Sequence, residues 1–211
     1  MNGRFLVLEG IDGCGKTTQL RALAEWLPGS GLMPPASALV CTREPGGTPL
    51  GRALRQLLLQ PPEGAAPVPR SELLLYAADR AQHVDTLVRP ALAAGDWVLS
   101  DRFSGSTAAY QGSGRGFDPA LIATLERIAT AGLRPDLCIW LDLPPALAIT
   151  RRRAQGDPDD RIEAEGLAFL ERVRAGFADL AQAPGWRRLA ADGSPGAVQD
   201  ALRDLLRQEL S

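Results

Sequence analysis

The chain reads Gly10-Ile11-Asp12-Gly13-Cys14-Gly15-Lys16-Thr17 shortly after its first residues. This segment fits the phosphate-binding pattern G-x-x-x-x-G-K-[ST], in which one lysine reaches between phosphate groups. Lys16 is the only lysine, so removing it from the 23 Lys and Arg residues leaves 22 arginines. A compact ammonium can pass where the wide, planar guanidinium of arginine cannot. The segment therefore predicts a loop that binds the phosphates of a nucleotide.

The residues on either side place this loop between a strand and a helix. The run from Arg4 to Glu9 is apolar and rich in β-formers, and apolar residues then recur at the spacing of one helix face. In such a turn, backbone N–H groups and the helix N-terminus bind phosphate oxygens, and a hydroxyl can bind Mg²⁺. The predicted nucleotide-binding residues are Gly10, Ile11, Asp12, Gly13, Cys14, Gly15, Lys16, Thr17 and Thr18, with Thr17 also a predicted metal ligand.

The composition, with 45% hydrophobic and 23% charged residues, predicts a single globular domain over residues 1–211. A net charge of −2 gives no broad basic surface for a nucleic acid polymer. The apolar run from Phe5 to Leu8 is too short for a membrane span. Three cysteines without metal-ligand spacing fit a reduced, cytoplasmic protein, and Cys14 is interpreted as a small loop residue rather than a redox group. A single histidine, His83, excludes sites built from several histidines.

Hydrophobic periodicity predicts an α/β fold. The expected strands cover residues 4–9, 38–42, 97–100, 137–141 and 187–190, the last at a sheet edge. The expected helices cover 17–27, 50–60, 71–84, 85–94, 118–131, 145–153, 162–183 and 195–210. Because strands alternate with helices, we expect a five-stranded parallel sheet flanked by helices on both faces, with the site at the carboxyl ends of the strands.

Phosphate loops serve several protein classes, so other residues must distinguish them. GTPases of the Ras type read guanine through an Asn-Lys-x-Asp segment, but Asn2 is the only asparagine and Lys16 the only lysine. That class is therefore excluded. The strand that starts at Trp97 ends in Asp101, a carboxylate placed to bind Mg²⁺ beside the phosphates. Helix capping is the alternative role for Asp101.

Arginines also gather around residues 155–159, which connect two predicted helices. They are Arg151, Arg152, Arg153 and Arg161. A kinase lid needs arginines above the triphosphate, because it must neutralise the transferred phosphoryl group and exclude water. We therefore expect a lid over about residues 151–161, with a solvated helix face as the alternative.

The whole chain resembles the bacterial thymidylate kinases. Besides the phosphate loop, the matching segments are Thr42-Arg-Glu-Pro-Gly-Gly-Thr48, Tyr76-Ala-Ala-Asp-Arg80, Asp101-Arg102-Phe103, Thr107-Ala-Ala-Tyr-Gln-Gly112 and Asp160-Arg-Ile-Glu163. Their order and spacing together are highly specific. The resemblance implies the P-loop NTPase fold and transfer of the γ-phosphoryl group of ATP, with Mg²⁺, to thymidine 5′-monophosphate (dTMP) in a cytoplasmic homodimer.

The resemblance also implies a substrate site. Its residues would be Asp12 at the sugar 3′-OH, Arg43 and Arg102 near the acceptor phosphate, Tyr76 stacked on the base, Arg80, Thr107 and Gln111 at the base edge, and Tyr110 under the sugar. The side chains suit these roles, because carboxylates accept hydrogen bonds and guanidinium groups match phosphate oxygens. Alternatively, Tyr76 is a core residue and Arg80 a surface ion-pair partner.

Members of this family carry a catalytic arginine either in the phosphate loop or in the lid. Gly13 and Cys14 leave this loop without an arginine, so the chain resembles the type whose arginine comes from the lid. We expect Arg151 or Arg153 to contact the transferring phosphoryl group. The predicted catalytic residues are Lys16, Arg102, Arg151 and Arg153.

The chain departs from the family pattern at three places. Phe103 replaces the usual tyrosine or histidine, Gln155 replaces a frequent arginine, and residues 156–160 are one residue longer than usual. Two other functions are alternatives: a kinase for another nucleoside monophosphate, or a nucleotide-gated binding module. The module is disfavoured, because Tyr76, Arg80 and Gln111 supply a second small-molecule pocket that a switch does not need.

Overall fold

The computed structural model describes residues 3–155, 161–162 and 165–210. Its centre is a five-stranded sheet in the order β2-β3-β1-β4-β5, and all neighbouring strands are parallel. The strands are β1 (Phe5–Glu9), β2 (Leu39–Arg43), β3 (Trp97–Asp101), β4 (Leu137–Asp142) and β5 (Trp186–Ala190). The predicted five-stranded parallel sheet, with β5 at an edge, is therefore confirmed.

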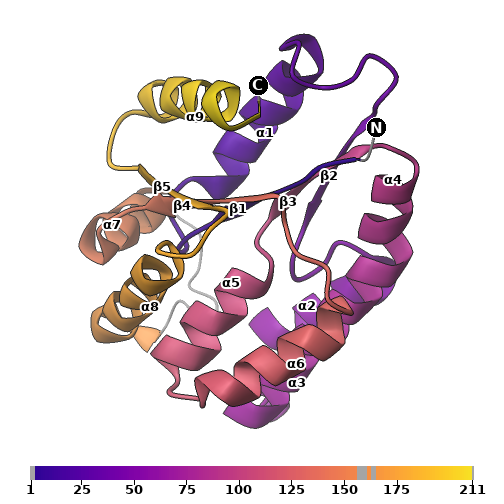
Figure 1. The fold of residues 1–211 in the computed structure, drawn as a ribbon. Helices are drawn as coiled ribbons and strands as arrows, with labels where there is room; N and C mark the ends of the chain where they lie inside the picture. The colour runs from indigo at the N-terminus through magenta and orange to yellow at the C-terminus, as the bar shows by residue number, and fades with distance from the viewer. Residues whose placement is uncertain (1–2, 156–160, 163–164, 211) are drawn as a thin grey trace.

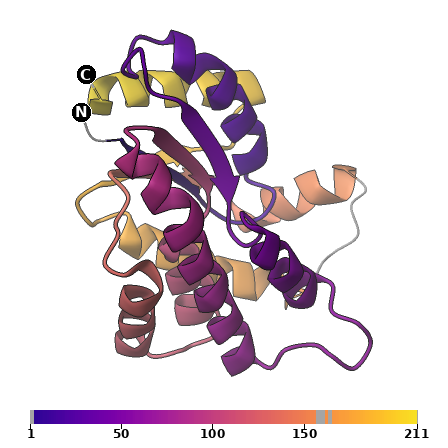
Figure 2. The same ribbon diagram turned by 90° about the vertical axis from the view of Figure 1, so that its right-hand side faces the viewer.

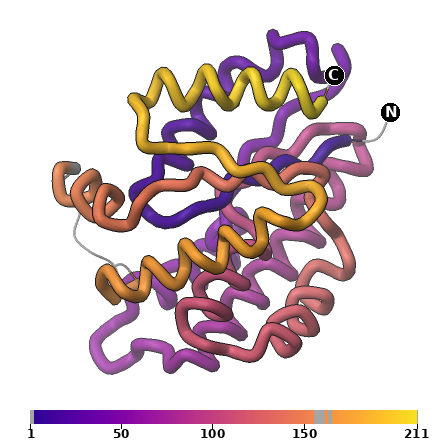
Figure 3. Tube along the Cα trace, turned by 60° about the vertical axis from the view of Figure 1, so that its left-hand side comes forward, coloured from indigo at the N-terminus to yellow at the C-terminus, as the bar shows by residue number. Residues whose placement is uncertain are grey.

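Helices cover both faces of this sheet (Figure 1). Helices α1 (Lys16–Trp26) and α9 (Pro195–Leu210) lie on one face, and α8 (Leu167–Leu180) lies on the other (Figure 3). With α8 lie α2 (Pro49–Leu59), α3 (Pro69–His83), α4 (Arg89–Ala93) and α6 (Pro119–Thr130). Helix α7 (Pro145–Gln155) follows β4 and extends along the edge of the molecule (Figure 2). Cover on both faces explains why β1 is buried at every position.

The sequence does not predict the helical segment over residues 104–114. This segment consists of α5 (Ser104–Thr107) and the π-helical turns η3 (Ala108–Gly114). It is rich in glycine and serine, which are poor helix formers. Packing against α8 requires them, because a Cβ added at Gly114 would lie 2.7 Å from the Phe169 ring. Likewise, a Cβ added at Gly176 of α8 would lie 2.7 Å from Ser113 Cβ. Close helix contact thus outweighs local propensity here.

Two predicted helix boundaries are wrong. Helix α3 begins at Pro69, which fits the first turn of a helix, and it continues through the π-helical turns η2 (Val84–Val88) into α4. The helix predicted over residues 162–183 begins only at Leu167, after Gly166 in the left-handed region (φ 87°), and ends at Leu180. Residues 163–164 of that prediction lie outside the described part of the chain.

Candidate active site

The glycine-rich loop lies between β1 and α1, as the sequence predicts. Gly13 (φ 83°) and Gly15 (φ 97°) adopt left-handed backbone conformations that favour glycine. A Cβ at Gly13 would lie 2.7 Å from the Ala148 carbonyl oxygen and 3.1 Å from Arg152 Cγ. The loop is therefore pressed against α7, and its backbone cannot accept a larger residue at this point.

The Lys16 ammonium is held inside the loop. Its Nζ donates to the carbonyl oxygens of Gly10 and Ile11, both at 3.0 Å, and the side chain is buried. A compact ammonium suits this buried position between two carbonyl oxygens, which agrees with the reason given for a lysine here. Burial raises the pKa of the Cys14 thiol, although the Lys16 charge opposes it. Cys14 therefore stays protonated, in agreement with its interpretation as a small loop residue.

A pair of oxygen ligands lies where the loop meets β3. Thr17 Oγ1 donates to Asp101 Oδ2 at 2.9 Å. The other carboxylate oxygen, Asp101 Oδ1, is buried and has no hydrogen-bond partner among the described residues. The alternative capping role is wrong, because the residue at the start of α5 is Phe103, without a side-chain cap. A hydroxyl and a carboxylate with an unused oxygen are the donor set that Mg²⁺ prefers, so these residues fit that ion.

Arg102 connects the loop to the 104–114 segment. Its Nη1 donates to the Gly10 carbonyl and to Ser106 Oγ, both at 2.9 Å, and its Nη2 donates to Asp12 Oδ1 at 2.5 Å. Tyr110 donates its hydroxyl hydrogen to Asp12 Oδ2 at 2.8 Å. Burial acts to raise the pKa of Asp12, but the charges of Arg102 and Lys16 hold it well below its usual range. Asp12 is thus an ionised acceptor in the site.

Arg80 is held rigidly at the inner end of the site. It donates to Glu44 Oε2 at 2.8 Å, to Glu126 Oε1 at 2.5 Å, to Thr107 Oγ1 at 2.9 Å and to the Phe103 carbonyl at 3.1 Å. These bonds use four of the five N–H groups of a guanidinium. Its exposed fraction is only 2%, so the alternative of a surface ion-pair partner is wrong.

Two cavities bring the predicted residues together. The inner cavity contains all the predicted substrate residues except Arg43; it is lined by Asp12, Tyr76, Arg80, Arg102, Thr107, Tyr110 and Gln111, among others. Tyr76 is half-buried there, so it is not a core residue. The phosphate cavity, of about 540 Å³, is lined by Asp12, Gly13, Gly15, Lys16, Thr17, Thr18, Arg43, Asp101 and Arg102, among others. The two cavities share Asp12, Glu44, Arg55 and Arg102.

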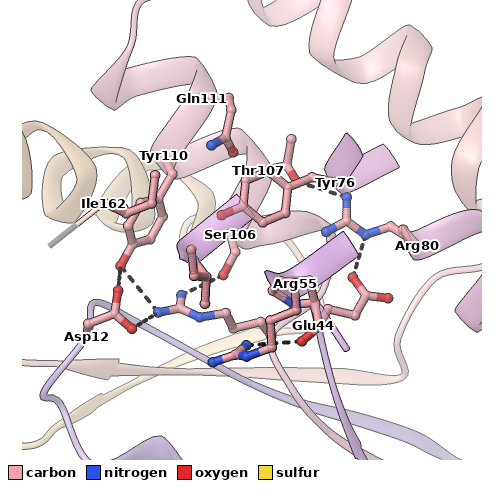
Figure 4. A pocket seen from close by; sticks show the side chains of 13 residues that line it. Asp12, Glu44, Arg55, Tyr76, Arg80, Ser106, Thr107, Tyr110, Gln111 and Ile162 are labelled. Atoms are coloured by element: carbon pink, nitrogen blue, oxygen red, sulfur yellow. Dashed lines mark hydrogen bonds and ion pairs between the residues drawn. The ribbon is translucent and has the colours of Figure 1, made fainter. Parts of the chain in front are cut away.

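Sequence reasoning misses Arg55. This residue of α2 lines both cavities and donates to the Pro45 carbonyl at 3.0 Å (Figure 4). Burial, followed by the charges of Arg43 and Arg102, lowers its pKa. Arg55 and Arg102 at the junction of the cavities, with Arg43 in the phosphate cavity, form a site for an anion. Arg55 lies outside every motif in the sequence, so nothing in the residues around it distinguishes it from any other helical arginine.

Glu9 is a second residue that sequence reasoning misses, although a carboxylate at the end of a buried strand is itself a signal. Its Oε1 accepts from the backbone N–H of Phe103 (3.0 Å) and of Ser106 (3.1 Å), and its Oε2 accepts from Ser106 Oγ at 2.6 Å. Burial raises the pKa of Glu9 to about 7, against hydrogen bonds that lower it. Glu9 thus fixes the turn that carries Arg102.

The arginines predicted for the lid separate in the structure. Arg151 donates to the carbonyl oxygens of residues 191–193, between β5 and α9, at 2.8–3.1 Å. Arg153 is exposed, whereas Arg152, which the catalytic prediction omits, is buried against Gly13 of the loop. Residues 156–160 of the predicted lid lie outside the described part of the chain.

A phosphate loop on a parallel sheet, with a second cavity that meets it at a cluster of arginines, defines a nucleotide kinase of the P-loop NTPase fold. Residues 8–202 match the family described as "Thymidylate kinase". The chain belongs to the thymidylate kinase family, and it is a kinase that phosphorylates thymidylate.

Similar proteins cover the whole chain. It is 68% identical over 210 residues to a thymidylate kinase of Synechococcus sp. (strain RCC307), covering 100% of this chain and 98% of the relative. It is 64% identical over 211 residues to that of strain CC9605, covering 100% of both. A solved thymidylate kinase structure from Ehrlichia chaffeensis is 32% identical with a TM-score of 0.78, covering 98% of this chain and 100% of that one.

The raised pKa of Glu9 predicts a specific pH dependence of stability. Its folded pKa of about 7 lies above the ordinary value of 4.5, so the stability it contributes is full below about pH 4.5 and is lost as the pH rises through 7. Glu9→Gln keeps a neutral group at all pH values. Between pH 5 and pH 8 we expect the unfolding free energy of this variant to gain about 2 kcal/mol relative to the unchanged protein.

Urea unfolding at the two pH values measures this difference. The exposed carboxylate Glu171 offers a matched control, because Glu171→Gln removes a charge from the same fold without touching the buried turn. Parallel stability curves for Glu9→Gln and the unchanged protein would contradict the assignment of a proton to Glu9.

Proposed function

We propose that this kinase transfers the γ-phosphoryl group of ATP, bound with Mg²⁺, to dTMP and so forms thymidine 5′-diphosphate. The observation that carries the proposal is the meeting of the two cavities at Asp12, Arg55 and Arg102. A donor nucleotide in one cavity and an acceptor in the other place their phosphates at this junction. Holding two reactants in this way supplies much of the catalysis in phosphoryl transfer.

The donor side consists of the phosphate loop. Residues 10–18 would surround the phosphates with backbone N–H groups, and Lys16 would exchange its carbonyl partners for phosphate oxygens. Thr17 and Asp101 would hold the Mg²⁺ ion, which, when bound, neutralises charge on the phosphate oxygens.

The acceptor side consists of the inner cavity and its arginines. Arg43, Arg55 and Arg102 would bind the acceptor phosphate, since guanidinium groups match phosphate oxygens in pairs. The ionised Asp12 would accept the hydrogen of the sugar 3′-OH, with the Tyr110 ring below the sugar. The base would stack on Tyr76 with its edge toward Arg80, Thr107 and Gln111.

A panel of acceptors tests the function. With Mg-ATP in a coupled assay of ADP release, we expect turnover of dTMP to exceed that of uridylate, guanylate and adenylate. Equal or faster turnover of guanylate would contradict the proposal.

In the same assay Lys16→Arg should lose at least about 100-fold in kcat, because the guanidinium does not fit the loop. The matched change Arg207→Lys on α9, far from the site, should leave kcat unchanged, and full activity of Lys16→Arg would refute the role of the loop.

The arginine that neutralises the transferring phosphoryl group would come from the run on α7. We keep Arg151 and Arg153 as candidates and add Arg152, because it is the one that packs on the loop. In single-turnover kinetics, replacement of the acting residue by alanine should slow the chemical step by roughly 10³-fold or more. Chemical steps near the unchanged rate in all three alanine variants would remove this part of the proposal.

We also infer a cytoplasmic homodimer. Three free cysteines among the described residues suit a reducing compartment. No described helix is both long and apolar enough to cross a membrane. Large apolar side chains are exposed on the adjacent helices α2, α3 and α6: Leu57 (41%), Leu74 (54%), Leu121 (49%) and Ile128 (69%). Exposed apolar side chains on neighbouring helices suit contact with a second copy of the chain.

Charges in this surface should weaken the dimer. Leu74→Asp with Ile128→Asp should raise the dimer Kd by at least about 10-fold in sedimentation equilibrium, because each places a charge in an apolar contact. Leu167→Asp is the control, since Leu167 is also 45% exposed but belongs to α8 and not to these three helices. Sedimentation of the unchanged protein as a monomer would contradict the dimer.

A further inference from the structure

Glu72 is a fully buried carboxylate of α3 that lies behind the inner cavity and does not line it. Its Oε1 accepts from Gln111 Nε2 and from Arg115 Nε, both at 2.7 Å. Its Oε2 accepts from Arg115 Nη2 at 2.9 Å and from Arg161 Nη2. Glu72 lines neither cavity, so direct contact with a nucleotide does not explain why a charge is buried at this position.

The surroundings of Glu72 keep it ionised. Burial acts to raise its pKa, but hydrogen bonds from Arg115, Gln111 and Arg161 outweigh burial and lower it. An ionised carboxylate accepts hydrogen bonds and donates none. Gln111 must therefore present its NH₂ group to Glu72, and its amide oxygen must point the other way.

That amide oxygen faces the inner cavity. Gln111 lines the inner cavity, and in Figure 4 its oxygen lies on the side of Thr107 and Tyr76 while its nitrogen lies on the opposite side. Arg80 and Thr107 are the other polar side chains proposed to lie at the base edge, and Thr107 Oγ1 already accepts a hydrogen bond from Arg80. A guanidinium has no acceptor atom, so Arg80 offers hydrogen-bond donors only, and Glu44 and Glu126 hold it in place. The base edge therefore meets a fixed donor beside a fixed acceptor.

This order of donor and acceptor distinguishes two pyrimidines. Thymine presents a carbonyl oxygen at position 4 and an N–H at position 3, which pair with the donor of Arg80 and the acceptor of Gln111. Cytosine presents an amino group and an unprotonated nitrogen at the same places, so both contacts are mismatched. Rotation of the Gln111 amide would relieve one mismatch, but it would turn the amide oxygen toward the Glu72 carboxylate.

We propose that Glu72 is a positioning residue that fixes the direction of the Gln111 amide and so makes the base site reject cytosine. The inference rests on thymidylate as the acceptor and adds a specificity determinant outside the residues that contact it. Its energetic basis is the cost of a buried polar group without a matching partner. A cytosine nucleotide would bear that cost, because its amino group and its unprotonated ring nitrogen would face Arg80 and the Gln111 oxygen.

Replacement of Glu72 by an amide tests the proposal. In Glu72→Gln the new side chain both donates and accepts, so the Gln111 amide can rotate. We expect the ratio of kcat/KM for dTMP to that for 2′-deoxycytidine 5′-monophosphate (dCMP) to fall about 10-fold, mainly through a lower KM for dCMP. A purely structural role would reduce both substrates equally, so an unchanged ratio would overturn the inference.

Glu165 provides the matched control. Its Oε1 accepts from Arg115 Nη1 at 2.8 Å, yet it does not contact Gln111. Glu165→Gln therefore disturbs the same arginine and should leave the ratio unchanged. In a Gln111→Ala background, Glu72→Gln should no longer alter the ratio. A change of ratio in Glu165→Gln, or an equal effect of Glu72→Gln without Gln111, would contradict the proposal.

A measurement on the unchanged protein covers the case in which Glu72→Gln does not fold. The side-chain NH₂ of Gln111 should show slow exchange with solvent in nuclear magnetic resonance, both alone and with dTMP bound, because Glu72 holds it. Rapid exchange would overturn the inference. So would a change of hydrogen-bond partner in which the Gln111 NH₂ group leaves Glu72 and donates to the base when dTMP binds. Failure to phosphorylate dTMP at all would instead contradict the proposed function.

Discussion

The Arg102 guanidinium is the contact on which the site depends. It binds the Gly10 carbonyl and Asp12 of the phosphate loop on one side and Ser106 on the other. Its backbone adopts φ 76°, which is costly for a residue with a Cβ. The bond from its N–H to the Leu8 carbonyl, at 2.9 Å, and the Glu9 carboxylate hold that turn in place. One strained residue thus lines both cavities and joins the phosphate loop to the 104–114 segment.

Buried ion pairs give the rest of the site its rigidity. Arg80 lies between Glu44 and Glu126, and Glu72 lies between Arg115 and Arg161. Each group would be costly to bury alone, and each has an oppositely charged partner in this arrangement. In the proposed function, Arg80 and Gln111 read the base, and this network of buried ion pairs holds both side chains in one direction.

Local patterns predicted much of the architecture. The run before Gly10 and the periodic residues after Lys16 place the phosphate loop correctly, because a strand, a glycine turn and a helix are decided by neighbouring residues. The 104–114 segment was not predicted, since its glycines are required by contact with Phe169 and with α8, far along the chain. Glu9 and Glu72 were missed for the same reason, because their partners are distant in sequence. Arg55 was missed because only the fold places it between the two cavities.

The sequence by itself determined the phosphate loop, the alternation of strands and helices along the chain, and the family. These depend on residue identity and short spacing, which sequence records directly. Only the tertiary structure decided that Arg80 is buried, that Arg151 reaches residues 191–193 and that Arg152 packs on Gly13. An arginine can extend several ångströms in many directions, so its partner is chosen by the fold around it and not by its place in a motif.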